Sequence, residues 1–188
     1  ALATSPGRDP ARAQLILDDS TEIRRAPPAA IIARHRTGHV LANAGIDASN
    51  VEGGDGAAVL LWPVDPDASA RAIRSELRRL SGVNVGLIIA DSMGRAWRIG
   101  TVGTAIGCAG ITGLDARRGT GQDLFGRTLQ ATVIAIADSL AAMAALAMGE
   151  GAEGTPAALV RGCGRWVTDE DGPGASCALR PLEEDMFR

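Results

Sequence analysis

Residues 85–110 read VGLIIADSMGRAWRIGTVGTAIGCAG, and this stretch decides the fold. The continuous apolar run from Val85 to Ala90 predicts a buried strand, and Thr101 to Ala109 predicts a second, glycine-rich strand. The glycines of this stretch do not have the G-x-G-x-x-G spacing of a dinucleotide-binding turn. They indicate instead that other parts of the chain approach the backbone closely, at Gly100, Gly103, Gly107 and Gly110.

On the amino-terminal side, Asp9-Pro10 predicts a helix start, and the helix is expected to run through Leu17. Two short strands are expected at Ala29–Ala33 and His39–Ala42, with a turn at Thr37-Gly38 between them. Two further elements are expected before residue 85. They are a strand over Ala57–Leu61 and a helix that starts at Asp65-Pro66-Asp67, with Ile73, Leu77 and Leu80 on one face and Arg71, Arg74 and Arg78 on another.

On the carboxyl-terminal side, residues 112–127 predict an irregular loop, and residues 127–148 predict one long alanine-rich helix ended by Gly149. Pro156–Val160 predicts a strand, and a polar tail follows from Thr168. The helix has an apolar stripe typical of a core face, made of Leu129, Val133, Ile136, Leu140 and Met143. Because strands and helices alternate irregularly, we expect an α+β fold with mixed or antiparallel sheets packed with helices.

The composition limits the possible functions. The chain has 188 residues and a net charge of −3, so it offers no electrostatic case for binding nucleic acid or an anionic membrane. All 19 basic residues are arginines, which excludes a P-loop lysine and Schiff-base chemistry. The apolar stretch from Ala131 to Gly149 contains Asp138 and is typical of a buried helix, and no signal peptide is visible. We therefore expect a cytoplasmic protein.

The cysteines and histidines do not predict a metal site or a nucleophile. The three thiols show no metal-ligand spacing and are expected to be reduced. The histidine pair lies beside a probable turn, without the helical context that a zinc pair needs. The chain has no plausible Ser-His or Cys-His set. These residues are Cys108, Cys163, Cys177, His35 and His39.

Two acidic motifs carry the strongest chemical signal. Asp47 lies in NAGIDASN (residues 43–50), and Asp91-Ser92 opens DSMGRAWR (residues 91–98), directly after the apolar strand. Carboxylate and hydroxyl oxygens suit Mg²⁺ or Mn²⁺, and the guanidinium groups of Arg95 and Arg98 suit phosphate. Taken singly, each acid fits a simple turn better than a metal site. Trp97 is expected in the core or in a groove wall.

Two loops are weaker candidates. Asp115 and Asp123 flank Arg117-Arg118-Gly119, an arrangement that suits either an anionic substrate or surface ion pairs. Residues 149–155 form a glycine-rich acidic segment, which by spacing alone is a helix cap and linker.

Several motifs, in their order along the chain, resemble the coenzyme F420-0:L-glutamate ligase family, also called the F420 gamma-glutamyl ligases. They are NAGIDASN, DPDASARAIR, DSMGRAWR, TAIGCAG and LVRG. The third is a variant, since the family often has Asp-Thr in place of Asp91-Ser92 and Pro in place of Ala96. The resemblance implies an enzyme that uses GTP to join L-glutamate to the lactyl carboxylate of the deazaflavin F420-0, through an acyl phosphate. Further gamma-linked glutamates are a possible extension of the same reaction.

The resemblance also implies roles for individual residues. Asp47, Asp91 and Ser92 would bind a divalent metal, Mg²⁺ or Mn²⁺, with Glu150 as a further ligand, and K⁺ is an additional candidate ion. Asp47, Asp91 and Arg95 would be catalytic, and the enzyme would be a homodimer. Asp115, Arg118 and Asp123 are assigned to substrate or nucleotide. The expected GTP contacts are Asn50 and the loop Met148, Gly149, Glu150, Gly151, Ala152, Glu153, Gly154 and Thr155.

The chain departs from the family pattern in two respects. Residues 1–188 correspond to the carboxy-terminal major part of the catalytic unit, so we expect a fragment or processed form without the amino-terminal segment. Gly103 and Ser139 stand where many relatives have acidic residues. Two alternatives to the ligase stay open: a non-catalytic module that binds deazaflavin or a partner, and a metal-dependent phosphohydrolase.

Overall fold

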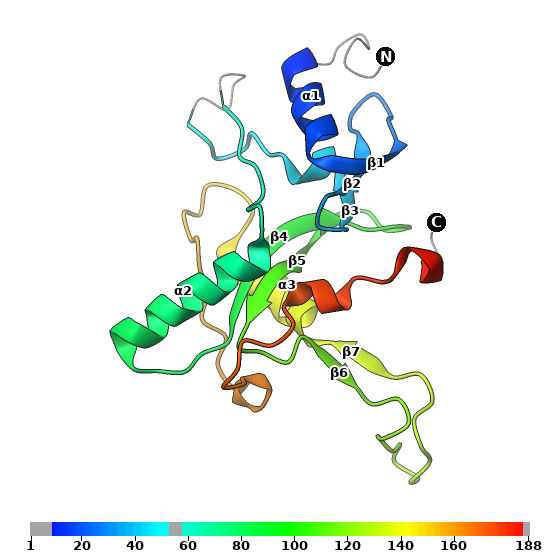
Figure 1. The fold of residues 1–188 in the computed structure, drawn as a ribbon, viewed down its shortest axis with the longest axis vertical. Helices are drawn as coiled ribbons and strands as arrows, with labels where there is room; N and C mark the ends of the chain where they lie inside the picture. Colours follow the sequence, from blue (N-terminus) through cyan, green and yellow to red (C-terminus); the bar gives the residue numbers. More distant parts are fainter. Residues whose placement is uncertain (1–8, 53–57, 186–188) are drawn as a thin grey trace. The chain divides into compact units, whose positions relative to one another are not determined.

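The computed structural model describes residues 9–52 and 58–185. The chain forms two compact units, drawn in Figure 1. Unit 1 consists of Ala1–Val64 and Met93–Val102, and unit 2 consists of Asp65–Ser92 and Gly103–Arg188. We describe each unit by itself.

Unit 1 begins with helix α1 (Pro10–Asp18), where the Asp9 side chain accepts a hydrogen bond from the backbone N–H of Ala11. A three-stranded antiparallel sheet follows, in the order β1-β2-β3. Its strands are β1 (Ser20–Arg25), β2 (Ile32–His35) and β3 (Val40–Ala42). The core of the unit is a buried cluster of Ile16, Ile31, Ala33, Ala44 and Ile46.

The sequence predicts most of unit 1 correctly. The first helix and the β2–β3 hairpin are confirmed, although β2 begins at Ile32 and runs to His35, later than expected. Strand β1 was not expected, because STEIRR shows no clean apolar alternation. The strand expected over Ala57–Leu61 falls partly outside the described residues. From residue 58 on it is reduced to one antiparallel bridge between Leu60 and Asp47.

Unit 2 contains two longer helices and two small antiparallel hairpins. The helices are α2 (Pro66–Ser81) and α3 (Ile136–Met148). Strand β4 (Leu87–Gly94) pairs with β5 (Thr101–Ala109), and the hairpin end of this pair belongs to unit 1. Strand β6 (Leu114–Ala116) pairs with β7 (Val133–Ala135). Three 3-10 turns complete the unit, η2 (Gly164–Trp166), η3 (Ala175–Ala178) and η4 (Leu182–Glu184). The expected α+β class with antiparallel sheets is confirmed.

Strand β5 packs closely against both helices through its glycines. A Cβ atom at Gly103 would lie 2.5 Å from the carbonyl oxygen of Ala141 on α3. A Cβ at Gly107 would collide with the backbone of Pro66, and one at Gly110 with the guanidinium of Arg74. The close approach predicted for these three glycines is therefore confirmed. Gly100 differs, because its surroundings are open and its φ is +91°.

The prediction for residues 127–148 is wrong in its first part. Helix α3 begins only at Ile136, because residues 133–135 pair as β7 with β6, from Leu114 opposite Ala135 to Ala116 opposite Val133. Leu129 and Val133 thus lie outside the helix. The two strands form an arm that projects from unit 2, with residues 117–132 at its end (Figure 1). The strand expected over residues 156–160 is also wrong, since this segment is irregular.

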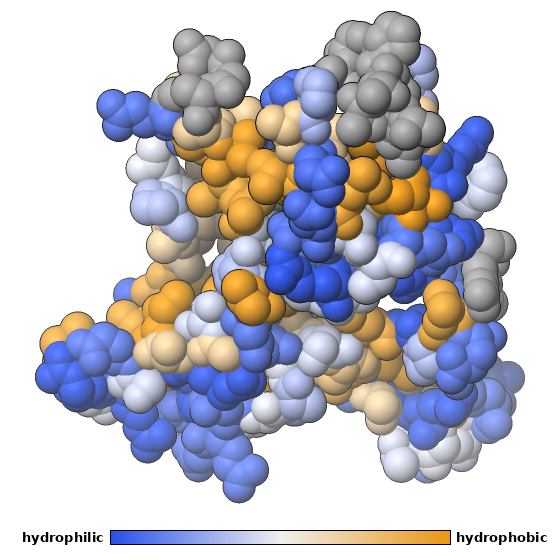
Figure 2. Space-filling view, turned by 45° about the horizontal axis from the view of Figure 1, so that its top comes forward, coloured by the Kyte–Doolittle hydropathy of each residue, from blue (hydrophilic) through white to orange (hydrophobic). Residues whose placement is uncertain are grey.

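Helix α2 shows an unusual distribution of side chains. Arg74 is only 4% exposed, whereas Ile73, Leu77 and Leu80 of the apolar face are 46%, 42% and 68% exposed. An amphipathic helix normally buries its apolar face and exposes its charges. Figure 2 likewise shows apolar residues at the molecular surface beside polar ones.

Within the described ranges, no helix combines the length and the apolar character that crossing a lipid bilayer requires.

Candidate functional site

The backbone before Asp47 makes a tight turn whose residues are fixed by local contacts. Asn43 and Ala44 have positive φ angles of 53° and 52° within the 3-10 turn η1 (Asn43–Gly45). The Asn43 side chain accepts a hydrogen bond from the N–H of Ile31 at 3.0 Å, and Ala44 is fully buried. At Gly45 a Cβ would collide with the ring of Trp62. The NAG part of the motif therefore positions the backbone that leads into Asp47.

The carboxylate of Asp47 is held at the end of this turn. The backbone of Asp47 forms two hydrogen bonds with Leu60, and its Oδ1 accepts one from the N–H of Ser49 at 2.9 Å. Burial disfavours its charged form, but hydrogen bonds from Ser49 and Ala48 and the charge of Arg12 outweigh this effect and lower the pKa of Asp47. The side chain is therefore an oriented anion at neutral pH. Asn50, three residues later, is exposed with a φ of 53°.

Asp91 and Ser92 lie within a strand and not after it, which corrects the prediction from sequence. Strand β4 continues to Gly94, because hairpin pairing with β5 carries it beyond the apolar run. Both residues are half-buried, and Asp91 Oδ1 accepts a hydrogen bond from the N–H of Ser92 at 2.7 Å. A carboxylate and a hydroxyl are thus adjacent on a regular element.

The hairpin turn after β4 carries Arg95. Its Nη1 donates a hydrogen bond to the carbonyl of Gly100 at 3.1 Å, which ties the two ends of the turn together. The side chain is exposed, and its remaining N–H groups are given no partner by the described residues. Trp97 is 90% exposed with a φ of 64°, so its expected place in the core is wrong.

The loop Met148–Thr155 is organised by its second glutamate. Glu153 Oε2 accepts a hydrogen bond from the N–H of Gly151 at 2.7 Å, and its side chain occupies the space that a Cβ at Gly149 would need. Gly149 ends α3 with a hydrogen bond to Ala145. Glu150 is exposed and has no side-chain partner among the described residues. Of the two acids, Glu150 is therefore the one available to a ligand.

The acids of the β6–β7 arm are used within the arm itself. Asp115 forms an ion pair with Arg117 at 2.8 Å. Asp123 accepts hydrogen bonds from the N–H groups of Phe125 and Arg127, and it also pairs with the Arg127 side chain at 2.7 Å. Arg118 is exposed without a partner among the described residues. Of the two roles that the sequence leaves open for these acids, surface ion pairs therefore fit both of them.

The donor set suits a hard metal ion only together with a ligand's own oxygens. Among the residues described, no three His, Cys, Asp or Glu side chains gather into a group that could hold a metal. Asp47 and Asn50 belong to unit 1, whereas Asp91, Ser92 and Glu150 belong to unit 2. Mg²⁺ commonly takes one or two protein carboxylates and completes its shell with water and substrate phosphates. Asp47 in unit 1, and Asp91 with Ser92 in unit 2, each offer oxygen donors of the type that such binding uses.

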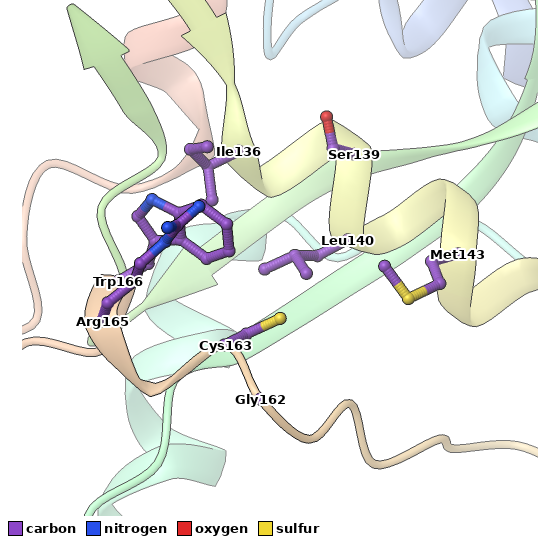
Figure 3. A pocket seen from close by; sticks show the side chains of 8 residues that line it. All are labelled: Ile136, Ser139, Leu140, Met143, Gly162, Cys163, Arg165 and Trp166. Carbon is purple, nitrogen blue, oxygen red and sulfur yellow. The ribbon is translucent and has the colours of Figure 1, made fainter.

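Unit 2 also has a pocket that the sequence did not predict. It encloses about 400 Å³ and lies between α3 and the segment 162–166 (Figure 3). Its residues come from two places about 25 positions apart, which explains why no single motif reveals it. The lining residues are Ile136, Ser139, Leu140, Met143, Gly162, Cys163, Arg165 and Trp166.

Neither the thiols nor the histidines form an activated nucleophile. Burial and the nearby charge of Asp67 raise the pKa of Cys108 to about 12, and burial also raises the pKa of Cys177. The histidines, His35 and His39, are buried in unit 1, and both bond the hydroxyl of Thr37 at 2.9 Å.

Comparison with known proteins gives one consistent result. The family profile described as F420-0:Gamma-glutamyl ligase matches residues 1–162. The chain is 46% identical over 187 residues to the coenzyme F420:L-glutamate ligase of Methanocaldococcus jannaschii, covering 100% of this chain and 72% of that protein. It is 45% identical over 188 residues to the protein of the same name in Methanopyrus kandleri, and the match covers 100% of this chain and 73% of that protein. The Haloarcula marismortui protein of that name is 43% identical, and the match covers 96% of this chain and 67% of that protein.

Proposed function

The chain belongs to the F420-0:gamma-glutamyl ligase family, and on this premise we propose that it is a ligase of coenzyme F420 biosynthesis that joins L-glutamate to F420-0 with GTP as phosphoryl donor. The observation that carries the proposal is the 46% identity across the whole chain to a protein named coenzyme F420:L-glutamate ligase. The motifs around Asp47 and Asp91 are part of the matched region.

The proposed reaction has two steps. A carboxylate oxygen of F420-0 attacks the γ-phosphorus of GTP, the bond from that phosphorus to the β-γ bridging oxygen breaks, and GDP leaves. The amine of glutamate then attacks the acyl carbon, phosphate leaves with the former carboxylate oxygen, and the amine proton passes to solvent. Neither step needs a covalent bond to the protein, so catalysis depends on positioning and electrostatics. The raised pKa values of Cys108 and Cys177 are consistent with this.

We propose that Asp47 and Asp91 are ligands to divalent metal, with Ser92 and Glu150 as further donors. When bound, Mg²⁺ or Mn²⁺ would neutralise negative charge on the transferring phosphoryl group. Asp47 supports this role as an ionised carboxylate that accepts a hydrogen bond from Ser49. Asp91 supports it through the hydrogen bond that its side chain accepts from the N–H of Ser92. K⁺ is proposed as an additional ion on family resemblance alone.

The chain's other polar groups would bind and orient the substrates. One N–H of Arg95 donates to Gly100, and the N–H groups that have no partner among the described residues would contact phosphate oxygens. The loop Met148–Thr155 is proposed to hold the nucleotide on family resemblance, and its residues from Gly149 to Thr155 are exposed. Asn50 is proposed as a second nucleotide contact. The Asp115, Arg118 and Asp123 assignments remain the weakest, since both acids already have partners in the arm.

We also propose that the enzyme is a homodimer. The support from the structure is the face of α2 where Ile73, Leu77 and Leu80 are exposed. Large apolar side chains gathered on one exposed face are typical of association surfaces.

The experiment that tests the proposed reaction uses F420-0 with ¹⁸O in its lactyl carboxylate. Incubation with GTP, L-glutamate and Mg²⁺ is expected to give a product one glutamyl residue heavier, GDP, and phosphate that contains one ¹⁸O atom. Phosphate release should require all three substrates. The label moves only if the carboxylate oxygen becomes bonded to phosphorus. Unlabelled phosphate with normal product would contradict the acyl phosphate, and GTP hydrolysis that ignores F420-0 and glutamate would favour a phosphohydrolase.

A further inference from the structure

The pocket of unit 2 has an apolar floor of a size that suits a flat ring. Ile136 and Leu140 are buried at 3% and 6% exposure, and Met143 of the next helical turn is half exposed. In Figure 3 the Leu140 side chain, the Met143 sulfur and the Cys163 thiol point toward one another across the floor. The volume of about 400 Å³ lies within the range of small-molecule sites.

The rim of the pocket carries one fixed positive charge. The guanidinium carbon of Arg165 lies 4.0 Å from the centre of the Trp166 ring, so a cation–π contact holds the planar group in place (Figure 3). Arg165 is exposed, and the described residues give its N–H groups no carboxylate partner. No acidic residue lines the pocket. The Arg165 guanidinium is thus free to bind anionic or carbonyl oxygens of a ligand.

We infer that this pocket binds a planar aromatic ring with electron-rich oxygens, and that this ring is the deazaflavin of F420-0, a step that rests on the function proposed above. The polar lining distinguishes the two aromatic substrates of that reaction. Guanine presents N–H donors that require acceptors such as a carboxylate, and the only side-chain oxygen in the lining is that of Ser139, which already donates to Ala135. Guanine sets three N–H donors against a single carbonyl oxygen, whereas the pyrimidinedione of the deazaflavin sets a single N–H donor against two carbonyl oxygens. The deazaflavin therefore matches the donors of Arg165 better and leaves fewer donors without an acceptor.

The first test uses Cys163 as a reporter inside the pocket. Because the pKa values of Cys108 and Cys177 are raised, Cys163 is expected to react first with N-ethylmaleimide. Saturating F420-0 should slow alkylation of Cys163 by about ten-fold or more, whereas GDP should not slow it. Peptide mass spectrometry of the full chain measures each thiol separately, and Cys177 serves as the internal control.

The second test changes the pocket itself. Met143→Trp fills the pocket and Arg165→Gln removes the charge, and each should weaken F420-0 binding by about ten-fold or more, measured by the ligand's own fluorescence. The matched controls are Leu146→Trp, at an 89% exposed position of the same helix, and Arg180→Gln, at an exposed arginine outside the pocket. These should change the affinity by less than about two-fold. Thermal unfolding confirms that all four variants are folded.

The outcomes separate this inference from the proposed ligase. Tight F420-0 binding that neither protects Cys163 nor responds to the two pocket variants overturns the pocket assignment and leaves the ligase in place. Protection by GDP alone also overturns it, in favour of the nucleotide. If F420-0 does not bind the wild-type chain at all, the inference and the proposed function fail together.

Discussion

At the scale of single residues, Arg74 is the most consequential side chain that the sequence did not single out as buried. Its guanidinium donates to Asp171 at 2.5 Å, to Asn84 at 2.7 Å and to the carbonyl oxygens of Val85 and Thr168. It therefore ties helix α2 to the start of β4 and to the segment after residue 167. A buried charge of this kind needs compensating partners, and each of the three nitrogens of the Arg74 guanidinium donates at least one hydrogen bond.

We predict that Arg74→Met lowers the free energy of unfolding by about 3 kcal/mol or more, because it leaves a carboxylate and several carbonyl groups without their donor. Arg78→Met, one turn later on the same helix and exposed, should cost less than about 0.5 kcal/mol. Guanidinium chloride unfolding of both variants measures the difference. Equal losses would show that Arg74 is not the anchor described here.

The histidines of unit 1 give a pH-dependent prediction. His35 is 1% exposed, and its Nδ1 accepts the N–H of Thr37 at 3.1 Å, so this nitrogen is unprotonated in the fold. Burial lowers the pKa of His35 below its ordinary value of 6.5. The ring of Trp62 packs on both histidines. The distance between ring centres is 5.0 Å to His35 and 5.2 Å to His39.

Because the unfolded chain binds the proton more readily than the folded chain, the contribution of His35 to stability is complete above pH 6.5 and declines as the pH falls below it. We predict that the free energy of unfolding decreases below this pH, and that His35→Asn reduces the slope. Chemical unfolding of both proteins at a series of pH values measures this dependence. A slope that is the same in the variant would assign the acid sensitivity to other groups.

At the scale of elements, the packing of β5 on α3 depends on the absence of a side chain at Gly103. A Cβ there would lie 2.5 Å from the Ala141 oxygen and 2.7 Å from the Ala145 Cβ. We predict that Gly103→Ala costs about 1–3 kcal/mol, because the helix must shift. Gly94→Ala in the neighbouring strand, where nothing lies within 4 Å, should be close to neutral. A Gly103→Ala chain as stable as wild type in thermal and denaturant unfolding would contradict this packing.

Elements with strong local signals were predictable, and those decided by pairing partners were not. Asp9-Pro10 and Asp65-Pro66 predicted the starts of α1 and α2 correctly, since capping is a local effect. The apolar spacing of Leu129 and Val133 imitated a helix, but β6 pairs with residues 133–135 and the helix starts after them. Strand β4 likewise continued past Ala90 because β5 extends alongside it.

The same difference between local signals and contacts made only on folding applies to the candidate site. The motif around Asp47 was recognisable because its polar residues lie within eight consecutive positions, and Ser49, two residues after Asp47, donates a hydrogen bond to its carboxylate. The pocket beside Arg165 was not recognisable, because α3 and residues 162–166 meet only in the folded unit. The ion pairs of Asp115 with Arg117 and of Asp123 with Arg127 join residues close in sequence, and surface ion pairs were one of the two alternatives that the sequence left open.

At the scale of the whole molecule, the proposed metal ligands belong to both units, with Asp47 in unit 1 and Asp91 in unit 2. Asparagine is the informative replacement at both positions. It keeps the oxygen that accepts the N–H of Ser49 or Ser92 and removes only the charge. Loss of activity in such a variant therefore reports on the charge of the carboxylate and not on the fold.

The most direct measurement of the central claim is the initial rate of F420-0- and glutamate-dependent phosphate release from GTP, with Mn²⁺ binding measured on the same samples. We predict that Asp47→Asn and Asp91→Asn each lower the rate by about 100-fold or more and weaken Mn²⁺ binding. The control Glu183→Gln, at an exposed acid without a described side-chain partner, should match wild type. Full turnover and unchanged Mn²⁺ binding in both asparagine variants would contradict the account.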